Sequence, residues 1–545
     1  MFRISARAQG RGLCLLLILW AGARLHAAGP AIFNVKDYGA TGKKSDDTRA
    51  AIQKAIDAAS GAGGGTVYFP PGEYTSGTLN LRSHVRIYLE SGATLFGSTE
   101  EKDFDKKAPN HSGLFYGEDL VNISIEGRGT VNGQAEYEWR EEERKGRYAH
   151  KEEMLKLDMP IRRTYPQGYP QRQLYPFLVF LVRCQDVRIT GLTFLRSPSW
   201  TICMYATERV VIDGIYAYTS LEEAVWADGI DLDGCRDVLI ANSVIETGDD
   251  CIIFISSNVW GPALPCENIT VTNCRLSTAS AAVKFSEGNW HMARRVTISN
   301  CVIVNANRAF VFSITQGGTI SDVVIANITI DLNRFDWFWA GDGQPFNFRI
   351  TRASEWNRQP RDPKEPPPGT IRNVKFSNII ARGKGSSAVY GHTENWLGDI
   401  SFDNVKLILT TDPNMPYDLA DHALKFRWAK NLRLTNVEVV WDKPALEKWQ
   451  SALVFEDVSG LVLDGFTGRQ AWPERDTPAV VFKNVTDAVV RNSRALEGTK
   501  TFLKVSGKGG REIILTGNDF RRAKSAYKTD EDVPSEAVKA VNNLP

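Results

Sequence analysis

The chain has 545 residues, and its 65 Lys and Arg against 64 Asp and Glu give a formal net charge of +1. This balance gives no electrostatic reason to expect a nucleic-acid partner or attraction to an anionic membrane surface. The length would allow several average domains, but elongated repeat folds reach it as one domain.

The first 28 residues have the pattern of a secretory signal peptide. Three arginines precede the apolar run 13–20, and Ala27 and Ala28 supply small residues at a cleavage site. The run is too short to span a bilayer, and no later segment is long enough. We therefore expect a secreted or periplasmic monomer without a stable membrane anchor.

The first predicted element after this segment is an amphipathic helix at 45–59. Asp is available as its N-terminal cap, and the glycine-rich segment 61–65 ends it. We expect this short helix to cap the N-terminal end of the hydrophobic core.

From Asp186 onward, a phrase such as Asp-Val-Arg-Ile-Thr-Gly recurs twelve times, with copies 23 to 32 residues apart and one spacing of 51. Apolar residues alternate within each copy, which is the period of a β-strand. The sixth position is Asn or Gly in every copy, which predicts a turn with left-handed backbone. Stacked Asn side chains can hydrogen-bond from coil to coil.

Repeats of this length without helical segments cannot be βαβ units. They predict an all-β solenoid, a parallel β-helix that occupies residues 29–520. A leucine-rich repeat lacks support because its Leu spacing is absent, and a propeller is disfavoured by the single strand-and-turn rhythm. We expect residues 521–545 to be a charged tail, with a short covering helix near Ser535–Asn542.

The cysteines follow the repeat. Cys235 and Cys266 each precede a repeat start by two residues, and Cys274 and Cys301 each follow one by six. Either pair is a disulfide between neighbouring coils or part of a ladder of buried thiols, and we favour thiols. No Cys-x-x-Cys spacing or His cluster suggests zinc.

Two insertions interrupt the rhythm, at 135–175 and within the 51-residue spacing. The second contains Trp337 and Trp339, and exposed aromatic side chains on loops suit stacking against sugar rings. We expect these two residues to bind substrate. The alternative is that the insertions only cover the side of the solenoid.

Two stretches one repeat apart, starting at Asp228 and Asp250, have the same strand pattern. If they stack as parallel strands about 4.8 Å apart, Asp228, Asp249 and Asp250 share one small surface. Like charges at this distance push carboxyl pKa values apart, which can give one site a proton donor and a proton acceptor.

Four aligned coils give three outward columns, which read Asp228, Asp250, Ala281, Arg308; then Asp231, Ile253, Lys284, Val311; then Asp233, Ile255, Ser286, Ser313. The positions between them are apolar, which supports this register. Carboxylates with nearby cations suit acid and base catalysis at a glycosidic bond. Two alternatives stay open, turn residues without chemistry and a Ca²⁺ site.

These motifs resemble glycoside hydrolase family 28, the polygalacturonases, over residues 32–470. The most specific are Ser197-Pro-Ser-Trp-Thr-Ile, Asp228-Gly-Ile-Asp and Thr247-Gly-Asp-Asp-Cys. The resemblance implies a right-handed β-helix and inverting hydrolysis of a pectic polysaccharide or oligosaccharide, without metal or cofactor. It also implies Asp249 as the general acid, with Asp228 and Asp250 positioning and deprotonating water.

The sequence departs from the family at its basic positions. Trp226 stands where the family has Asn, Ser280-Ala281-Ala282 replaces Gly-His-Gly, and Ile255 replaces a Lys. Because the missing cations hold galacturonate in the family, we expect a changed carboxylate-binding subsite. The residues expected to contact substrate there are Lys284, Arg308, Asp231 and Trp226. The alternative functions are a calcium-dependent polysaccharide lyase and a non-catalytic glycan-binding β-helix.

Overall fold

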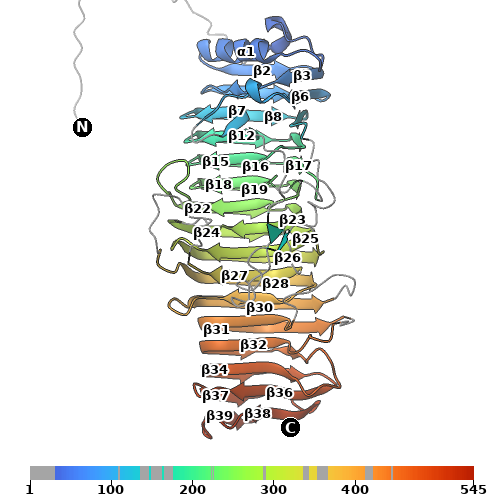
Figure 1. Cartoon of the computed structure of the whole chain (residues 1–545), viewed down its shortest axis with the longest axis vertical. Coiled ribbons are helices and arrows are strands. Elements are labelled where there is room, and N and C mark those ends of the chain that lie inside the picture. Colours follow the sequence, from blue (N-terminus) through green and yellow to red (C-terminus); the bar gives the residue numbers. More distant parts are fainter. Residues whose placement is uncertain are drawn as a thin grey trace, which may run out of the picture.

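The computed structural model describes residues 31–545 except 108–110, 136–146, 149–162, 165–175, 222–223, 225, 287–289, 336–342, 353–365, 411–420 and 443–445. The described chain is nearly all β and forms a long stack of parallel strands (Figure 1). Within the part described, no helix has both the length and the apolar character needed to cross a membrane.

Three series of paired strands run along the stack. The series that carries the site consists of β4 (Leu79–Asn80), β7 (Ser112–Glu118), β12 (Pro176–Val182), β15 (Ile202–Tyr205), β18 (Ile230–Asp233), β21 (Ile252–Ile255), β23 (Arg275–Phe285), β25 (Val302–Ile314), β27 (Gln344–Ile350), β29 (Ser387–Tyr390), β31 (Leu424–Trp441), β32 (Leu453–Asp464), β34 (Pro478–Arg491), β36 (Thr499–Ser506) and β38 (Ala523–Thr529). Each strand pairs in parallel with the next one in this order, so residues far apart in sequence become neighbours.

The second series contains the recurring phrases. Its strands are β1 (Ile32–Asn34), β2 (Gly65–Phe69), β5 (Val85–Leu89), β8 (Val121–Gly127), β13 (Gln185–Thr190), β16 (Glu208–Asp213), β19 (Arg236–Ala241), β22 (Cys266–Thr272), β24 (Met292–Ser299), β26 (Thr319–Leu332), β28 (Thr370–Gly383), β30 (Leu397–Leu409), then parts of β31, β32 and β34, and finally β37 (Arg511–Thr516) and β39 (Val538–Val541).

The third series has shorter strands. They are β3 (Gly72–Ser76), β6 (Ala93–Gly97), β9 (Thr130–Asn132), β14 (Thr193–Leu195), β17 (Tyr216–Tyr218), β20 (Val244–Thr247), β33 (Thr467–Gly468) and β35 (Arg494–Ala495), with segments of the long strands between β20 and β33. Outside the stack, β10 (Arg147–Tyr148) and β11 (Arg163–Thr164) form a separate antiparallel pair, and η1 (Val35–Tyr38) and η2 (Glu101–Asp103) are single 3₁₀ turns.

The core between the series is a ladder of apolar side chains. The inward positions expected from the alternation are buried, and neighbouring coils stack their aromatic rings, as in Phe254 on Phe285 (centroids 4.7 Å apart) and Phe285 on Phe312 (4.5 Å). The seven cysteines of the described chain are buried free thiols, as favoured from the sequence. Their sulfurs pack as small apolar groups between coils.

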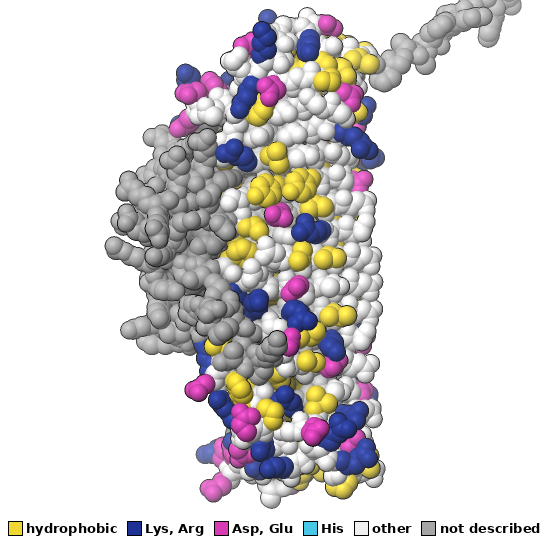
Figure 2. Space-filling model, turned by 90° about the vertical axis from the view of Figure 1, so that its right-hand side faces the viewer, with side chains coloured by type: hydrophobic (Ala, Val, Ile, Leu, Met, Phe, Trp, Pro, Cys, Tyr) yellow, Lys and Arg dark blue, Asp and Glu magenta, His cyan; other side chains and the backbone are white. Residues whose placement is uncertain are grey.

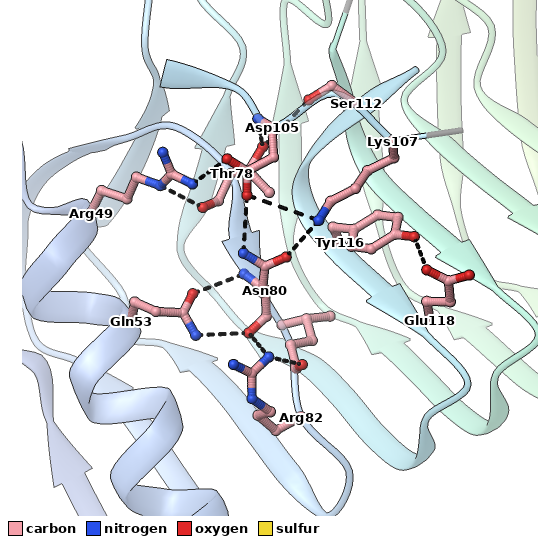
Figure 3. Close-up of polar contacts among 11 residues, drawn as sticks. Arg49, Gln53, Thr78, Asn80, Arg82, Asp105, Lys107, Ser112, Tyr116 and Glu118 are labelled. Atoms are coloured by element: carbon pink, nitrogen blue, oxygen red, sulfur yellow. Dashed lines mark hydrogen bonds and ion pairs between the residues drawn. The ribbon is translucent and has the colours of Figure 1, made fainter. Parts of the chain in front are cut away.

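Helix α1 (Arg49–Gly61) lies at the N-terminal end of the stack, where its residues Ile52, Ala55, Ile56 and Ala59 are buried. Figure 3 shows how its polar face is held. Arg49 donates to the Thr78 carbonyl and pairs with Asp105 at 2.7 Å, and Gln53 exchanges two hydrogen bonds with the backbone of Asn80.

The turn positions expected from the repeat have left-handed backbone. The sixth position of every copy has positive φ, from 50° at Asn436 to 75° at Gly465. The first position of every copy is left-handed too, which the sequence reading did not anticipate, although Asp, Asn and Gly are frequent there. The Asn side chains form the expected coil-to-coil ladder, including Asn273 to Asn242 at 2.6 Å and Asn327 to Asn300 at 3.0 Å.

The C-terminal segment differs from the expectation. Residues 521–545 were expected to form a tail with a helix near Ser535–Asn542, and that helix is wrong, because β38 and β39 continue the stack there. They pair with β36 and β37, and Val533 and Ala537 are buried beside them. The free backbone groups of the preceding coil supply this pairing, which outweighs the charged, weakly alternating sequence.

Candidate active site

The strand register brings the expected columns together. Asp231 pairs with Ile253, Ile253 with Lys284, and Lys284 with Val311. In the first column, the Asp228 carboxylate meets the Asp250 backbone, and Ala281 pairs with Arg308. The register between β23 and β25 shifts between Thr278 and Ala281, just before the pair of Ala281 with Arg308. The columns predicted from the sequence are therefore confirmed.

Three carboxylates meet where β18 and β21 begin. Asp228, Asp249 and Asp250 each place one oxygen within 4.8 Å of the other two. The Asp250 backbone N–H donates to Asp228 Oδ1 at 2.8 Å and to Asp249 Oδ1 at 2.9 Å, and the Ala281 N–H donates to Asp250 Oδ1 at 2.8 Å. Backbone groups therefore fix one oxygen of each carboxylate.

Burial and mutual repulsion govern how this cluster holds protons. As whole residues, Asp228, Asp249 and Asp250 are 4%, 6% and 2% exposed, so Asp249 is the most accessible. Burial, together with the neighbouring carboxylates, raises the pKa of Asp228 and of Asp249 well above the ordinary range, and Lys284 lowers it in part. Two of the three groups are therefore suited to keep a proton.

Lys284 supplies the cation of the cluster. Its Nζ lies 3.0 Å from Asp250 Oδ2, and its side chain is 19% exposed. Arg308 is partly exposed and follows Asp250 by two strands in the first column, about 10 Å at about 4.8 Å per strand. Both expected cations therefore lie on the site face, and Lys284 contacts the carboxylates directly.

The other two carboxylates of the columns, Asp231 and Asp233, are also buried. Asp231 is fully buried, neither of its oxygens has a hydrogen-bond partner, and burial with repulsion from Asp250 and Asp249 raises its pKa well above the ordinary range. This burial favours an electrostatic role over the substrate contact predicted for Asp231. Asp233 accepts hydrogen bonds from both the N–H and the hydroxyl of Ser257, while its burial raises its pKa to about 6.

The expected aromatic contacts are only partly described. Trp226 lies partly exposed in a turn two residues before Asp228. Trp337 and Trp339 lie outside the described residues.

The donor set favours acid and base catalysis over a hard cation. A Ca²⁺ ion seeks six to eight oxygen ligands. Here one oxygen of each carboxylate already accepts a backbone N–H, and the Lys284 ammonium stands against Asp250 where a divalent cation would need a ligand. A cation in this place would meet the ammonium's repulsion.

Sequence reasoning missed an aromatic group beside the carboxylates. Trp200 lies in register with Asp228, because Ile202 pairs with Ile230. The signal was available in the spacing, since 28 residues separate Trp200 from Asp228, as they separate the repeat starts Arg209 and Asp237.

Two family models match the chain. Residues 32–132 match "Rhamnogalacturonase A/epimerase, pectate lyase-like", and residues 167–334 match "Glycosyl hydrolases family 28". A probable polygalacturonase from Vitis vinifera is 23% identical over 403 residues, which cover 70% of this chain and 74% of that protein. A mannuronan C5-epimerase from Azotobacter vinelandii is 45% identical over 104 residues, but these are 17% of this chain and 11% of the epimerase.

Solved structures share the fold. An exopolygalacturonase from Thermotoga maritima aligns with a TM-score of 0.55 at 21% identity, covering 76% of this chain and 93% of that one. A family 28 exopolygalacturonase from Yersinia enterocolitica aligns with a TM-score of 0.56 at 17% identity, covering 85% and 78%.

Proposed function

Because the chain is a member of glycoside hydrolase family 28, we propose that it is an exported enzyme that hydrolyses a glycosidic bond in a pectic polysaccharide with inversion. The observation that carries this proposal is the cluster of Asp228, Asp249 and Asp250, in which one oxygen of each residue lies within 4.8 Å of the other two. Export is proposed from the N-terminal signal pattern.

The roles follow from charge. Asp249 is the general acid, since its raised pKa keeps a proton available for the leaving oxygen and its side chain is the most exposed of the three. Asp250 is the base that activates water, and Lys284 Nζ lies 3.0 Å from its Oδ2. Asp228 supplies a second oxygen to hold that water.

We propose inversion although the oxygens lie closer than the roughly 6.5–9.5 Å typical of an inverting carboxyl pair. A retaining mechanism would make one carboxylate a covalent nucleophile. Inversion is therefore proposed from the family resemblance. Proton NMR of the first-formed anomer distinguishes the two outcomes.

The family membership also supports a right-handed winding and a capping role for α1, whose buried residues Ile52, Ala55, Ile56 and Ala59 face the first coils. The carboxylate-binding subsite is changed, because Ile255 stands where the family has Lys and Ala281 falls in its His motif. Lys284 and Arg308 are two of the cations that the described residues place on this face.

Replacing the proposed acid tests the function. Asp249→Asn is expected to lower turnover at least a thousandfold on whichever glycan the wild type cleaves, because the amide cannot donate a proton of comparable acidity. The measurement is reducing-end release from a panel of pectic and neutral glycans, with EDTA present in parallel. Asp403→Asn is the matched control, since Asp403 lies on β30 away from the site and is 43% exposed.

Retained turnover in Asp249→Asn would contradict the assignment of the acid. Loss of wild-type activity in EDTA, with products that absorb in the ultraviolet, would instead identify a calcium-dependent lyase. An inert wild type that still binds glycan would identify a binding protein.

A further inference from the structure

The first column continues from the carboxylates into aromatic rings. Trp200 stands in register with Asp228, and the neighbouring Thr201 N–H donates to the Asp228 carbonyl at 2.8 Å. One coil earlier, Phe177 occupies the same column and stacks on Trp200, with centroids 5.1 Å apart and ring planes 4° apart. The catalytic carboxylates are therefore adjoined on their N-terminal side by stacked rings.

Trp260 joins this group from the loop that follows β21. Ser257, near the start of the loop, bonds to Asp233 through both its N–H and its hydroxyl. Further along, the Tyr205 hydroxyl donates to the Pro262 carbonyl at 2.9 Å. These contacts on either side of Trp260 hold its ring over the site face.

We name Trp200, Trp260, Phe177, Phe180 and His111 the aromatic platform. The Trp260 ring centroid lies 5.0 Å from that of Phe180 and 4.3 Å from that of His111. The two phenylalanines are buried, whereas both tryptophans and the imidazole stay partly exposed. Burial lowers the pKa of His111 to about 4, so this ring is uncharged near neutral pH.

The platform suits a neutral sugar and not a uronate. A pyranose ring presents an apolar C–H face that packs against aromatic rings, as ligand sites lined by aromatic side chains do. A carboxylate pressed there would lose water without gaining a partner. The Lys107 ammonium lies over the ring of Tyr116, 4.5 Å from its centroid. The same ammonium donates to the Asn80 side chain at 3.2 Å and lies 4.0 Å from the Asp105 carboxylate.

The opposite side of the carboxylates carries basic side chains, of which Lys284 pairs with Asp250 at 3.0 Å and Lys425 pairs with Glu456 at 3.7 Å. Lys284 and Arg308 lie on the next coils, and four strands beyond Lys284 the same column reaches Lys425. Beside Lys425, Arg427 packs over the Tyr390 ring at 5.0 Å and pairs with Glu456. The site face thus changes from aromatic to basic across the catalytic carboxylates.

We propose that the aromatic platform is a subsite for a neutral sugar, so that the substrate is a pectic heteropolymer with a neutral unit on the platform and a uronate on the cationic side of the cleaved bond. This inference rests on the proposed hydrolase function and specifies its substrate class. Trp200 and Trp260 are the residues that determine the specificity.

Binding to an inactive protein tests the platform independently of catalysis. In the Asp249→Asn background, calorimetry compares oligosaccharides that alternate galacturonate with rhamnose against galacturonate oligomers of equal length. Adding Trp200→Ala is expected to weaken binding of the alternating probe at least tenfold and binding of the pure galacturonate probe less than twofold. Trp200→Phe is expected to restore most of the affinity, because a ring face remains.

Further variants keep the test decisive. Trp260→Ala is expected to give the same selective loss, and it serves if Trp200→Ala fails to fold. Trp472→Ala, a partly exposed tryptophan that bonds the Leu446 carbonyl far from this face, is expected to change neither affinity. Equal loss for both probes, or no loss for either, would overturn the platform.

The two proposals fail in different ways. If wild-type protein cleaves no glycan but the alternating probe binds through Trp200, the hydrolase function fails and the platform stands. If wild type cleaves pure galacturonate chains and the Trp200→Ala variant keeps its kcat and KM on them and on the alternating substrate, the platform alone fails.

Discussion

Lys284 is the residue whose charge most directly sets the behaviour of the site. It pairs with Asp250 and lowers the pKa that burial and repulsion raise at Asp249. A general acid acts only while protonated, so activity should fall as pH rises through the pKa of Asp249. The ammonium therefore determines where the alkaline limb of the pH profile lies.

Removing this charge should move that limb. Lys284→Met is expected to shift the alkaline limb of the kcat profile to higher pH by roughly one unit, because Asp249 then keeps its proton longer. The same change should lower maximal kcat at least tenfold, since Asp250 loses its partner. Lys284→Arg keeps the charge and should leave the limb in place; a limb that moves to lower pH would contradict the assignment.

At this scale the carboxylates could be predicted from the sequence and the loop contacts could not. Residues one coil apart in sequence become neighbours in the stack, so the contact between Asp228 and Asp250 could be predicted from their spacing. Trp260 reaches the site from a loop, whose course depends on the Asp233–Ser257 and Tyr205–Pro262 contacts. The repeat spacing of the sequence predicts neither of these two contacts.

At the scale of the element, the Asn ladder stabilises each turn in two ways. Asn327 has φ of 58°, donates to Asn300 at 3.0 Å and accepts from Asn378 at 3.0 Å. An asparagine tolerates left-handed backbone better than other residues that carry a Cβ. Both its conformation and its amide therefore contribute to holding adjacent coils together.

Substitutions at Asn327 should separate the two contributions. Asn327→Ala is expected to cost about 3 kcal/mol, from two lost hydrogen bonds and left-handed strain. Asn327→Gly should cost about 1–2 kcal/mol, because only the bonds are lost. Urea unfolding followed by circular dichroism measures both; a glycine variant less stable than the alanine variant would refute this account.

Some strands of the stack could be predicted from the sequence and others could not. Clear alternation with Asn or Gly at the turn identified the strands of the second series from β13 to β37. β38 and β39 were missed because their side chains are partly or fully exposed. Exposed positions need not be apolar, so these strands lack the alternation that identifies a strand in the sequence. Their pairing comes from backbone hydrogen bonds, which any sequence can make.

At the scale of the whole molecule, the stack has two ends and a mixed surface. Figure 2 shows basic and acidic side chains interspersed on the described part of the face in view, in keeping with the net charge of +1. At the N-terminal end lies α1, whose residues Ile52, Ala55, Ile56 and Ala59 are buried; in stacked repeats, terminal units with a polar outer face are needed for solubility.

Charging the buried side of α1 should therefore promote association. Ile56→Glu is expected to displace the helix and expose the end of the core, producing oligomers and a melting temperature lower by several degrees. Light scattering after size-exclusion chromatography measures the mass. Lys54→Glu, on the exposed face of the same helix, should remain monodisperse; equal behaviour of the two variants would exclude a capping role.

The in-register stacking of Trp200 on the Asp228 coil carries an evolutionary corollary. Each coil is a repeated unit of the stack. Gaining or losing one whole coil between the aromatic rings and a distant cation would therefore move the cation's contact with the polymer by the height of one coil. Descendants of such a gene could alter how far apart two sugars must be recognised in whole-number increments, while every atom that breaks the bond stays where it was.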